Sequence, residues 1–372
     1  MKHPTPLHRK STLRCARQRH RDVLALLVLL CVTCGLSGCP GRVGPDWERE
    51  LGKWPFDTGT SPALRQAQLE VGLRPDSPEA HVRLGEQYAV HGLPGLAMGE
   101  FHTALNYDRS YGRAYLGAAA IEVECGDLDR ALALSRQAVI AMPGEPLVLI
   151  HLGQIRLRRR ECTQAQEAFA QAIQRQPDND AAWLGLITAY LEGGQAAEAR
   201  ECGEKALQQL GDLPAVRTNY GLALEALEEY EAAAEQYRIA LRTARDIDIA
   251  LPMNNLSYMY ASLDENLDEA LMLAEQATAL RSRNASCIDT LGYVQYRLKR
   301  YEEAVGTLAR AKALRPTSGT VRYHLGLALE ALGKTQEATA EFLEALRLDP
   351  NTPGATDARR RAAMHSPAAR GS

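Results

Sequence analysis

Alanine recurs in this chain with a fixed period of about 34 residues. One column of alanines keeps a constant spacing with a single longer step, after Ala233: Ala63, Ala97, Ala131, Ala165, Ala199, Ala233, Ala270, Ala304 and Ala338. A second column follows two helical turns later: Ala104, Ala138, Ala172, Ala206, Ala240, Ala277, Ala311 and Ala345. Self-similarity at a fixed period of about 20–50 residues is typical of repeat architectures, whose units bury their apolar faces only by stacking. Because small residues let helices cross closely, we expect each unit to be a pair of antiparallel helices.

Two further columns fix the type of repeat. Leu-Gly pairs stand at 84–85, 152–153, 291–292 and 325–326, and prolines mark repeat ends at Pro75, Pro143, Pro177, Pro316 and Pro350. The segment 183–190 places Trp183 and Tyr190 at the aromatic positions of one unit. Together these columns resemble the tetratricopeptide repeat, in which a Trp, a Leu-Gly pair, a Tyr, an Ala, a Phe and a Pro recur at this period.

The resemblance covers residues 62–352. It implies an all-α, right-handed superhelical solenoid of about eight full helix-turn-helix repeats, preceded by a half repeat at 62–77. The full repeats are predicted at 78–111, 112–145, 146–179, 180–213, 214–247, about 248–284, 285–318 and 319–352. Residues 353–372 form the C-terminal cap or tail, with a short helix expected over 356–365.

The N-terminal segment 1–38 reads as a targeting signal. It carries seven basic residues and one acidic residue, whereas the whole chain has a net charge of −3. The apolar run 23–35 is shorter than the ~20 residues that a membrane-spanning helix needs. A basic segment, a short apolar core and small residues behind it are the parts of a secretory signal peptide. The alternative is an uncleaved signal anchor.

The signal ends in Leu36, Ser37, Gly38 and Cys39, which resembles the bacterial lipobox. The resemblance implies cleavage before Cys39 and lipidation of its thiol. Because two or three acyl chains hold a protein firmly at a bilayer, this would be a lasting membrane anchor. Pro40 replaces the Asp that favours the inner membrane in similar lipoproteins. We therefore expect an envelope protein, lipid-anchored at the outer membrane and facing the periplasm.

Residues 39–61 are predicted to be a Gly/Pro-rich tether. Trp47, Trp54 and Phe56 are unusual in a linker. They are expected to cap the first repeat, and the alternative is contact with the membrane surface.

The chain carries no pattern for catalysis, a cofactor or a metal. There is no HExxH, no CxxC paired with His, no phosphate-binding glycine loop and no GxSxG. The charge balance argues against nucleic-acid binding, since such proteins show a basic surplus. Neither an enzyme activity nor a small-molecule substrate is expected. Cys125 and Cys162 are expected near one edge of the solenoid. They could form a disulfide, and the alternative is two buried free thiols.

The first helix of each repeat should present residues four apart to the concave surface. In the early repeats this row is apolar, with Val82, Leu116, Ile150 and Leu184. In the last three it becomes polar and aromatic. The candidate groove residues for a partner segment are Asn254, Tyr258, Asp289, Tyr293, Tyr296, Arg297 and Tyr323. Tyrosine offers apolar area with a polar tip, which suits peptide capture, and packing between helices is the alternative.

These observations predict a membrane-anchored scaffold of the bacterial envelope that binds protein partners in its groove. Similar lipoproteins serve pilus and secretin assembly, export or outer-membrane assembly. Two alternatives remain: an accessory regulator docking an envelope enzyme such as a peptidoglycan hydrolase, or an intracellular adaptor.

Overall fold

The computed structural model describes residues 61–244, 249–352 and 354–365. Within these ranges the chain forms 18 helices and no strand. This confirms the predicted all-α array of tetratricopeptide type. The predicted signal peptide, lipobox and most of the tether lie outside the described residues.

The helices fall into two compact units, residues 1–193 and 194–372. The described part of the first unit holds α3 (Pro62–Leu73), α4 (Pro78–Val90), α5 (Pro94–Tyr107), α6 (Gly112–Cys125), α7 (Leu128–Ala141), α8 (Pro146–Arg158), α9 (Cys162–Arg175) and α10 (Asp180–Glu192). The second unit begins with α11 (Ala196–Leu210), so the repeat predicted at 180–213 contributes one helix to each unit.

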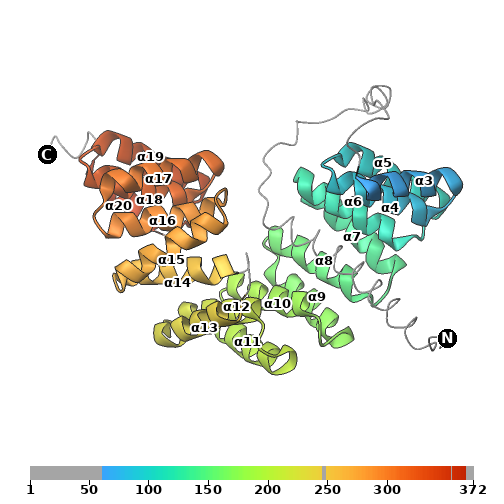
Figure 1. Ribbon diagram of the computed structural model, residues 1–372, viewed down its shortest axis with the longest axis horizontal. Helices are drawn as coiled ribbons and strands as arrows, with labels where there is room; N and C mark the ends of the chain where they lie inside the picture. The colour runs from blue at the N-terminus through green and yellow to red at the C-terminus, as the bar shows by residue number, and fades with distance from the viewer. Residues whose placement is uncertain (1–60, 245–248, 353, 366–372) are drawn as a thin grey trace, which may run out of the picture. The chain divides into compact units, whose positions relative to one another are not determined.

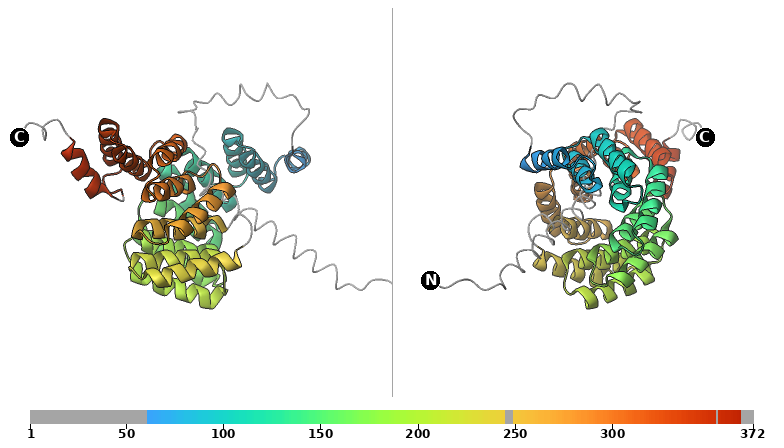
Figure 2. Two further views of the ribbon diagram at one scale, coloured as in Figure 1. Left: turned by 60° about the vertical axis from the view of Figure 1, so that its left-hand side comes forward. Right: turned by 90° about the vertical axis from the view of Figure 1, so that its right-hand side faces the viewer.

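The second unit continues with α12 (Pro214–Ala226), α13 (Tyr230–Thr243), α14 (Ala250–Leu263), α15 (Leu267–Leu280), α16 (Ala285–Arg297), α17 (Tyr301–Leu314), α18 (Gly319–Ala331), α19 (Thr335–Leu348) and α20 (Ala355–Met364). The two helices of each repeat pack together, as in α14 with α15 and α18 with α19. The first helices of neighbouring repeats also touch, since α14 contacts α16 and α16 contacts α18. Figures 1 and 2 show this regular order within each unit.

Local sequence explains where the helices begin. Proline occupies the first turn of α3, α4, α5, α8 and α12, where its missing N–H costs nothing. Side-chain oxygens of Ser77, Asp127, Asn179 and Ser318 accept hydrogen bonds from backbone N–H groups in the first turns of α4, α7, α10 and α18. The repeat boundaries are therefore encoded by caps as well as by the apolar pattern.

The alanine columns are the packed centre of the array. From Ala97 to Ala338 and from Ala104 to Ala345, every alanine of the two columns is fully buried. The Leu-Gly pairs explain the close approach beside them. A Cβ atom on Gly85 would lie 2.7 Å from the ring of Phe101, and one on Gly326 would lie 2.5 Å from the ring of Phe342. Glycine at these points lets the aromatic ring of the second helix rest on the first.

The apolar row of the early repeats belongs to this packing. Val82, Leu116 and Ile150 are only 2–5% exposed. They therefore form core between repeats rather than the exposed groove lining that the sequence predicted, and Leu184 alone of the row is half-buried. Their branched side chains fill the space where neighbouring first helices meet.

Candidate functional site

The predicted groove residues lie on three neighbouring helices of the second unit. Asn254 and Tyr258 are one turn apart on α14, and Asp289 and Tyr293 occupy the matching positions on α16. Tyr296 and Arg297 end α16, and Tyr323 lies in the first half of α18. All four tyrosines are half-buried. We call Tyr258, Tyr293, Tyr296 and Tyr323 the tyrosine face.

The rings of the tyrosine face meet around a histidine that the sequence analysis did not select. The ring of His324, on α18, stacks on Tyr293 with centroids 4.4 Å apart. Its centroid lies 6.1 Å from that of Tyr258 and 5.7 Å from that of Tyr323. Tyr293 also lies 5.5 Å from Tyr258. These separations are those of favourable aromatic pairs, so His324 links rings from all three helices.

Asp289 is bound to the same histidine. Nδ1 of His324 lies 3.0 Å from Oδ1 and 3.1 Å from Oδ2 of Asp289. Both side chains are buried, with His324 2% and Asp289 7% exposed. Because a carboxylate only accepts, Nδ1 carries the hydrogen and donates. Asp289 was predicted to line the groove, whereas the structure uses its carboxylate to hold His324 in place.

Arg297 lies at the edge of the tyrosine face. Its Nη1 donates to the hydroxyl of Tyr293 at 3.1 Å, and its guanidinium lies 5.9 Å from the centroid of that ring. Nη2 forms an ion pair with Asp264 at 3.0 Å. The cation therefore fixes the Tyr293 hydroxyl and keeps a partly exposed charge beside the rings.

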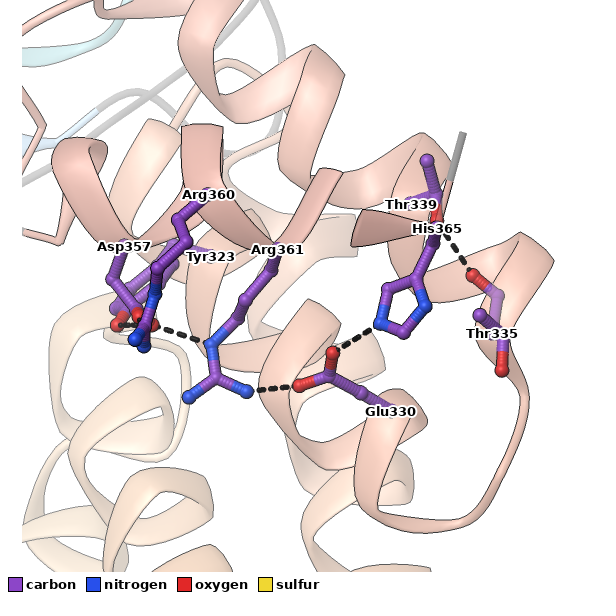
Figure 3. A network of polar contacts seen from close by, with 8 residues as sticks. All are labelled: Tyr323, Glu330, Thr335, Thr339, Asp357, Arg360, Arg361 and His365. Carbon is purple, nitrogen blue, oxygen red and sulfur yellow. Dashed lines mark hydrogen bonds and ion pairs between the residues drawn. The ribbon is translucent and has the colours of Figure 1, made fainter. Parts of the chain in front are cut away.

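The terminal helix α20 borders the other end of the face (Figure 3). The Tyr323 hydroxyl donates to Oδ2 of Asp357 at 3.0 Å. Arg361 binds both Asp357 and Glu330, and Nε2 of His365 lies 2.5 Å from Glu330. Burial works to raise the pKa of Asp357, but hydrogen bonds from Arg361, Arg360 and Tyr323 outweigh it and lower that pKa. Asp357 is therefore ionised at neutral pH and anchors α20 to Tyr323.

The hydroxyls of Tyr258, Tyr296 and Tyr323 stay protonated at neutral pH. Burial, then the charges of Tyr293 and Asp289, raises the pKa of Tyr258 to about 12. Burial, then the hydrogen bond to Asp357, raises the pKa of Tyr323, and burial also raises that of Tyr296. These three residues offer apolar rings with neutral hydroxyl groups at their tips.

Asn254 is the predicted site residue least tied to this network. Its Oδ1 is buried and has no hydrogen-bond partner among the described residues. The structure thus brings together six of the seven predicted residues, while Asn254 shares only their helix row. His324 was not predicted because the spacing of the row selects Tyr323 on α18, and His324 is the next residue along the helix. Its separation from Asp289 in the chain, one repeat period plus one position, was the available signal.

Within the described ranges, no group of three or more His, Cys, Asp or Glu side chains is arranged to hold a metal ion. Over residues 61–244, 249–352 and 354–365, none of the helices has the length and apolar character to cross a membrane. Cys162, Cys202 and Cys287 are free thiols, so the disulfide considered for Cys125 and Cys162 is not formed.

Family models match two windows of the chain. Residues 151–214 match the model described as tetratricopeptide repeat. Residues 264–345, which include most of the tyrosine face, match the model described as anaphase-promoting complex, cyclosome, subunit 3.

Two curated relatives share part of the sequence. BBSome complex member BBS4 of Bos taurus is 24% identical over 214 residues, which cover 56% of this chain and 39% of the relative. Anaphase-promoting complex subunit 6 of Arabidopsis thaliana is 27% identical over 177 residues, which cover 46% of this chain and 32% of the relative. The match therefore spans less than half the length of either relative.

Solved structures share the fold. The APC/C hetero-tetramer Cut9–Hcn1 matches 80% of this chain and 58% of its own chain, with a TM-score of 0.55 and 18% identity. A tetratricopeptide repeat protein from Parabacteroides merdae matches 69% of this chain and 99% of its own, with a TM-score of 0.53 and 16% identity. Together with the family models, these likenesses show that the described residues form tetratricopeptide repeats, a fold of the protein-interaction type.

Proposed function

We propose that this protein is a membrane-anchored scaffold of the bacterial cell envelope, and that a segment of a partner protein docks on the tyrosine face. The observation that carries the proposal is the gathering of four half-buried tyrosines around His324 on three successive first helices, with Tyr296 joined to the group through Tyr293. Aromatic side chains ringed by polar groups are the usual composition of an interface hot spot.

The names of the relatives support the scaffold part of this proposal. BBS4 is named as a member of the BBSome complex, and the plant relative as a subunit of the anaphase-promoting complex. Both names describe components of multiprotein assemblies. We infer the same role for this chain, with a pilus, secretin, export or outer-membrane assembly as the machine that it joins.

The anchor part rests on Leu36, Ser37, Gly38 and Cys39. These residues lie outside the described ranges, and the support is the lipobox pattern behind a short apolar run. Cys39→Ala should leave an unprocessed, unacylated precursor, visible by mass and by the loss of a labelled fatty acid. Equal processing and equal lipid labelling of wild type and variant would overturn the anchor, while leaving the docking proposal in place.

Docking can be tested with a photo-crosslinking amino acid at position 296 in intact cells. The matched control position is Ile140, which is 72% exposed on α7 in the first unit. We expect a discrete adduct from position 296 that the control position does not give. Identification of the captured protein then separates an assembly component from an envelope enzyme, which is the accessory-regulator alternative. Capture of the same proteins from both positions would overturn docking at the tyrosine face.

A further inference from the structure

Helix α3 has an open face. By its position in the repeat, α3 corresponds to α5, α7 and the other second helices. Each of those helices follows a first helix of its own repeat, whereas no helix precedes α3 among the described residues. It packs on α4 through Leu64 and Ala67, which are 3% and 5% exposed. On its other side Ala63 is exposed, although the eight later alanines of that column are fully buried. Leu73 is 81% exposed, the largest value among the large hydrophobic side chains of the described residues.

The next repeat shows how a first helix covers these positions there. There the ring of His81, on the first helix, stacks on Tyr107 at the end of the second helix, with centroids 5.6 Å apart. Tyr88, two turns further along the first helix, packs against the cluster that contains Ala97 and Phe101. In this repeat the first helix therefore covers its partner through two aromatic positions that lie two turns apart.

Shifting this repeat back by one period gives a matching set. At this shift, His81 corresponds to Trp47 and Tyr88 to Trp54 on the first helix. On the second helix, Tyr107 corresponds to Leu73 and Ala97 to Ala63. Both aromatic positions of a first helix are thus present in the segment before α3, and both of their contact points are exposed on α3. The four correspondences hold at one common shift.

We propose that residues 44–54 dock on the open face of α3 as the first helix of a further complete repeat, which would end before Pro55. Trp47 would cover Leu73, and Trp54 would cover Ala63. Residues 55–61 would then connect this helix to α3, within the usual range of about 2–8 residues for packed helices. One consequence rests on the proposed function. If Cys39 is lipidated, only residues 40–43 would separate the anchor from the array, and the array would be held close to the bilayer.

The sequence of α20 argues against a second copy of the chain as the occupant. Helix α20 is the one first-type helix without a second helix among the described residues of its unit, so it is the natural candidate for head-to-tail stacking. However, the Leu325-Gly326 pair corresponds to Arg359-Arg360 one repeat later. Arginine at the glycine position would prevent the close approach that Gly326 permits, and terminal repeats of solenoids carry such polar outer faces.

Tryptophan fluorescence of the full chain tests the proposal. The chain has three tryptophans, and Trp183→Phe leaves Trp47 and Trp54 as the reporters. In that background Leu73→Asp removes the proposed contact of Trp47. The matched control is Leu69→Asp, since Leu69 is 68% exposed on the same helix but lies outside the predicted contact. All proteins are purified in one detergent, and circular dichroism confirms that the remaining helices are folded.

We expect emission in the parent protein to be blue-shifted and protected from acrylamide. Leu73→Asp should shift the emission to the red and increase quenching, whereas Leu69→Asp should leave both unchanged. Water-like emission in the parent, no effect of Leu73→Asp, or equal effects of the two substitutions would each overturn the docking. The result does not depend on lipidation, so it can fail or succeed separately from the proposed anchor.

Discussion

The imidazole of His324 and the carboxylate of Asp289 form a buried pair, with Nδ1 3.0 Å and 3.1 Å from the two carboxylate oxygens. The pair joins α16 to α18 beneath the tyrosine face. Removing one partner leaves the other buried without its hydrogen bond. We therefore expect Asp289→Ala to lower the free energy of unfolding by about 1–3 kcal/mol in urea denaturation.

A double-mutant cycle separates the pair from the packing of each side chain. His324→Leu and Asp289→Ala together should cost less than the sum of the two single variants, because the second substitution removes a group that is already unpartnered. A coupling of ~0.5–3 kcal/mol is the usual range for residues in direct contact. Strict additivity would show that the contact contributes nothing.

A second prediction concerns the alanine column. Ala304 is fully buried at a helix crossing of α17. Ala304→Leu should overpack that crossing and lower the free energy of unfolding by ~1–3 kcal/mol. Because stability in repeat arrays is largely nearest-neighbour, protection from hydrogen exchange should fall most in α16, α17 and α18.

The matched control for this variant is Gly306→Ala on the same helix. A Cβ atom at Gly306 would meet nothing within 4 Å. Since alanine is favoured over glycine in a helix interior by roughly 0.5–1 kcal/mol, this substitution should stabilise the protein. If Ala304→Leu were as stable as the wild type, the close crossing inferred from the column would be wrong.

The repeat array could be predicted from sequence because its determinants recur. Ala97 and its equivalents are buried by the same local geometry in each unit, so a single period identifies them all. The network around His324 has no such repetition. A small rotation of α16 about its axis decides whether Asp289 faces a groove or a neighbouring imidazole, and the spacing of residues in the sequence does not determine that rotation. The engagement of Tyr323 by Asp357 depends in turn on α20 docking, and no repeated residue signals that contact.

A third prediction is a pH dependence that originates in the first unit. Burial, then the charge of Arg158, lowers the pKa of His151 from its usual value of 6.5 to about 4. The folded protein therefore keeps this imidazole neutral at pH values where the unfolded chain binds a proton. Stability should be unaffected by this group above pH 6.5 and should fall as the pH decreases toward 4, by about 3 kcal/mol at 1.36 kcal/mol per pKa unit.

Urea denaturation at pH 7.5 and at pH 5 measures this effect. His151→Leu removes the titrating group, so the variant should lose less stability between the two pH values than the wild type does. Other groups also titrate in this interval, but they are common to both proteins and cancel in the comparison. Identical losses in the two proteins would refute the assignment to His151.

The last prediction distinguishes binding from packing on the tyrosine face. Tyr323 is committed to the structure, because its hydroxyl donates to Asp357 and its ring lies 6.1 Å from that of Phe342. Tyr296 is half-buried at the C-terminal end of α16, and its ring neighbours are Tyr293 and Tyr301. Tyr323→Ala should therefore lower the melting temperature. Tyr296→Ala should lower the melting temperature less than Tyr323→Ala does, and it should weaken binding of the partner identified by crosslinking, by roughly thirtyfold for a hot spot that contributes ~2 kcal/mol. Both quantities should be measured on both variants, with capture expressed per folded molecule. Lower melting with normal capture for Tyr296→Ala would assign this tyrosine to packing and exclude it from the docking site.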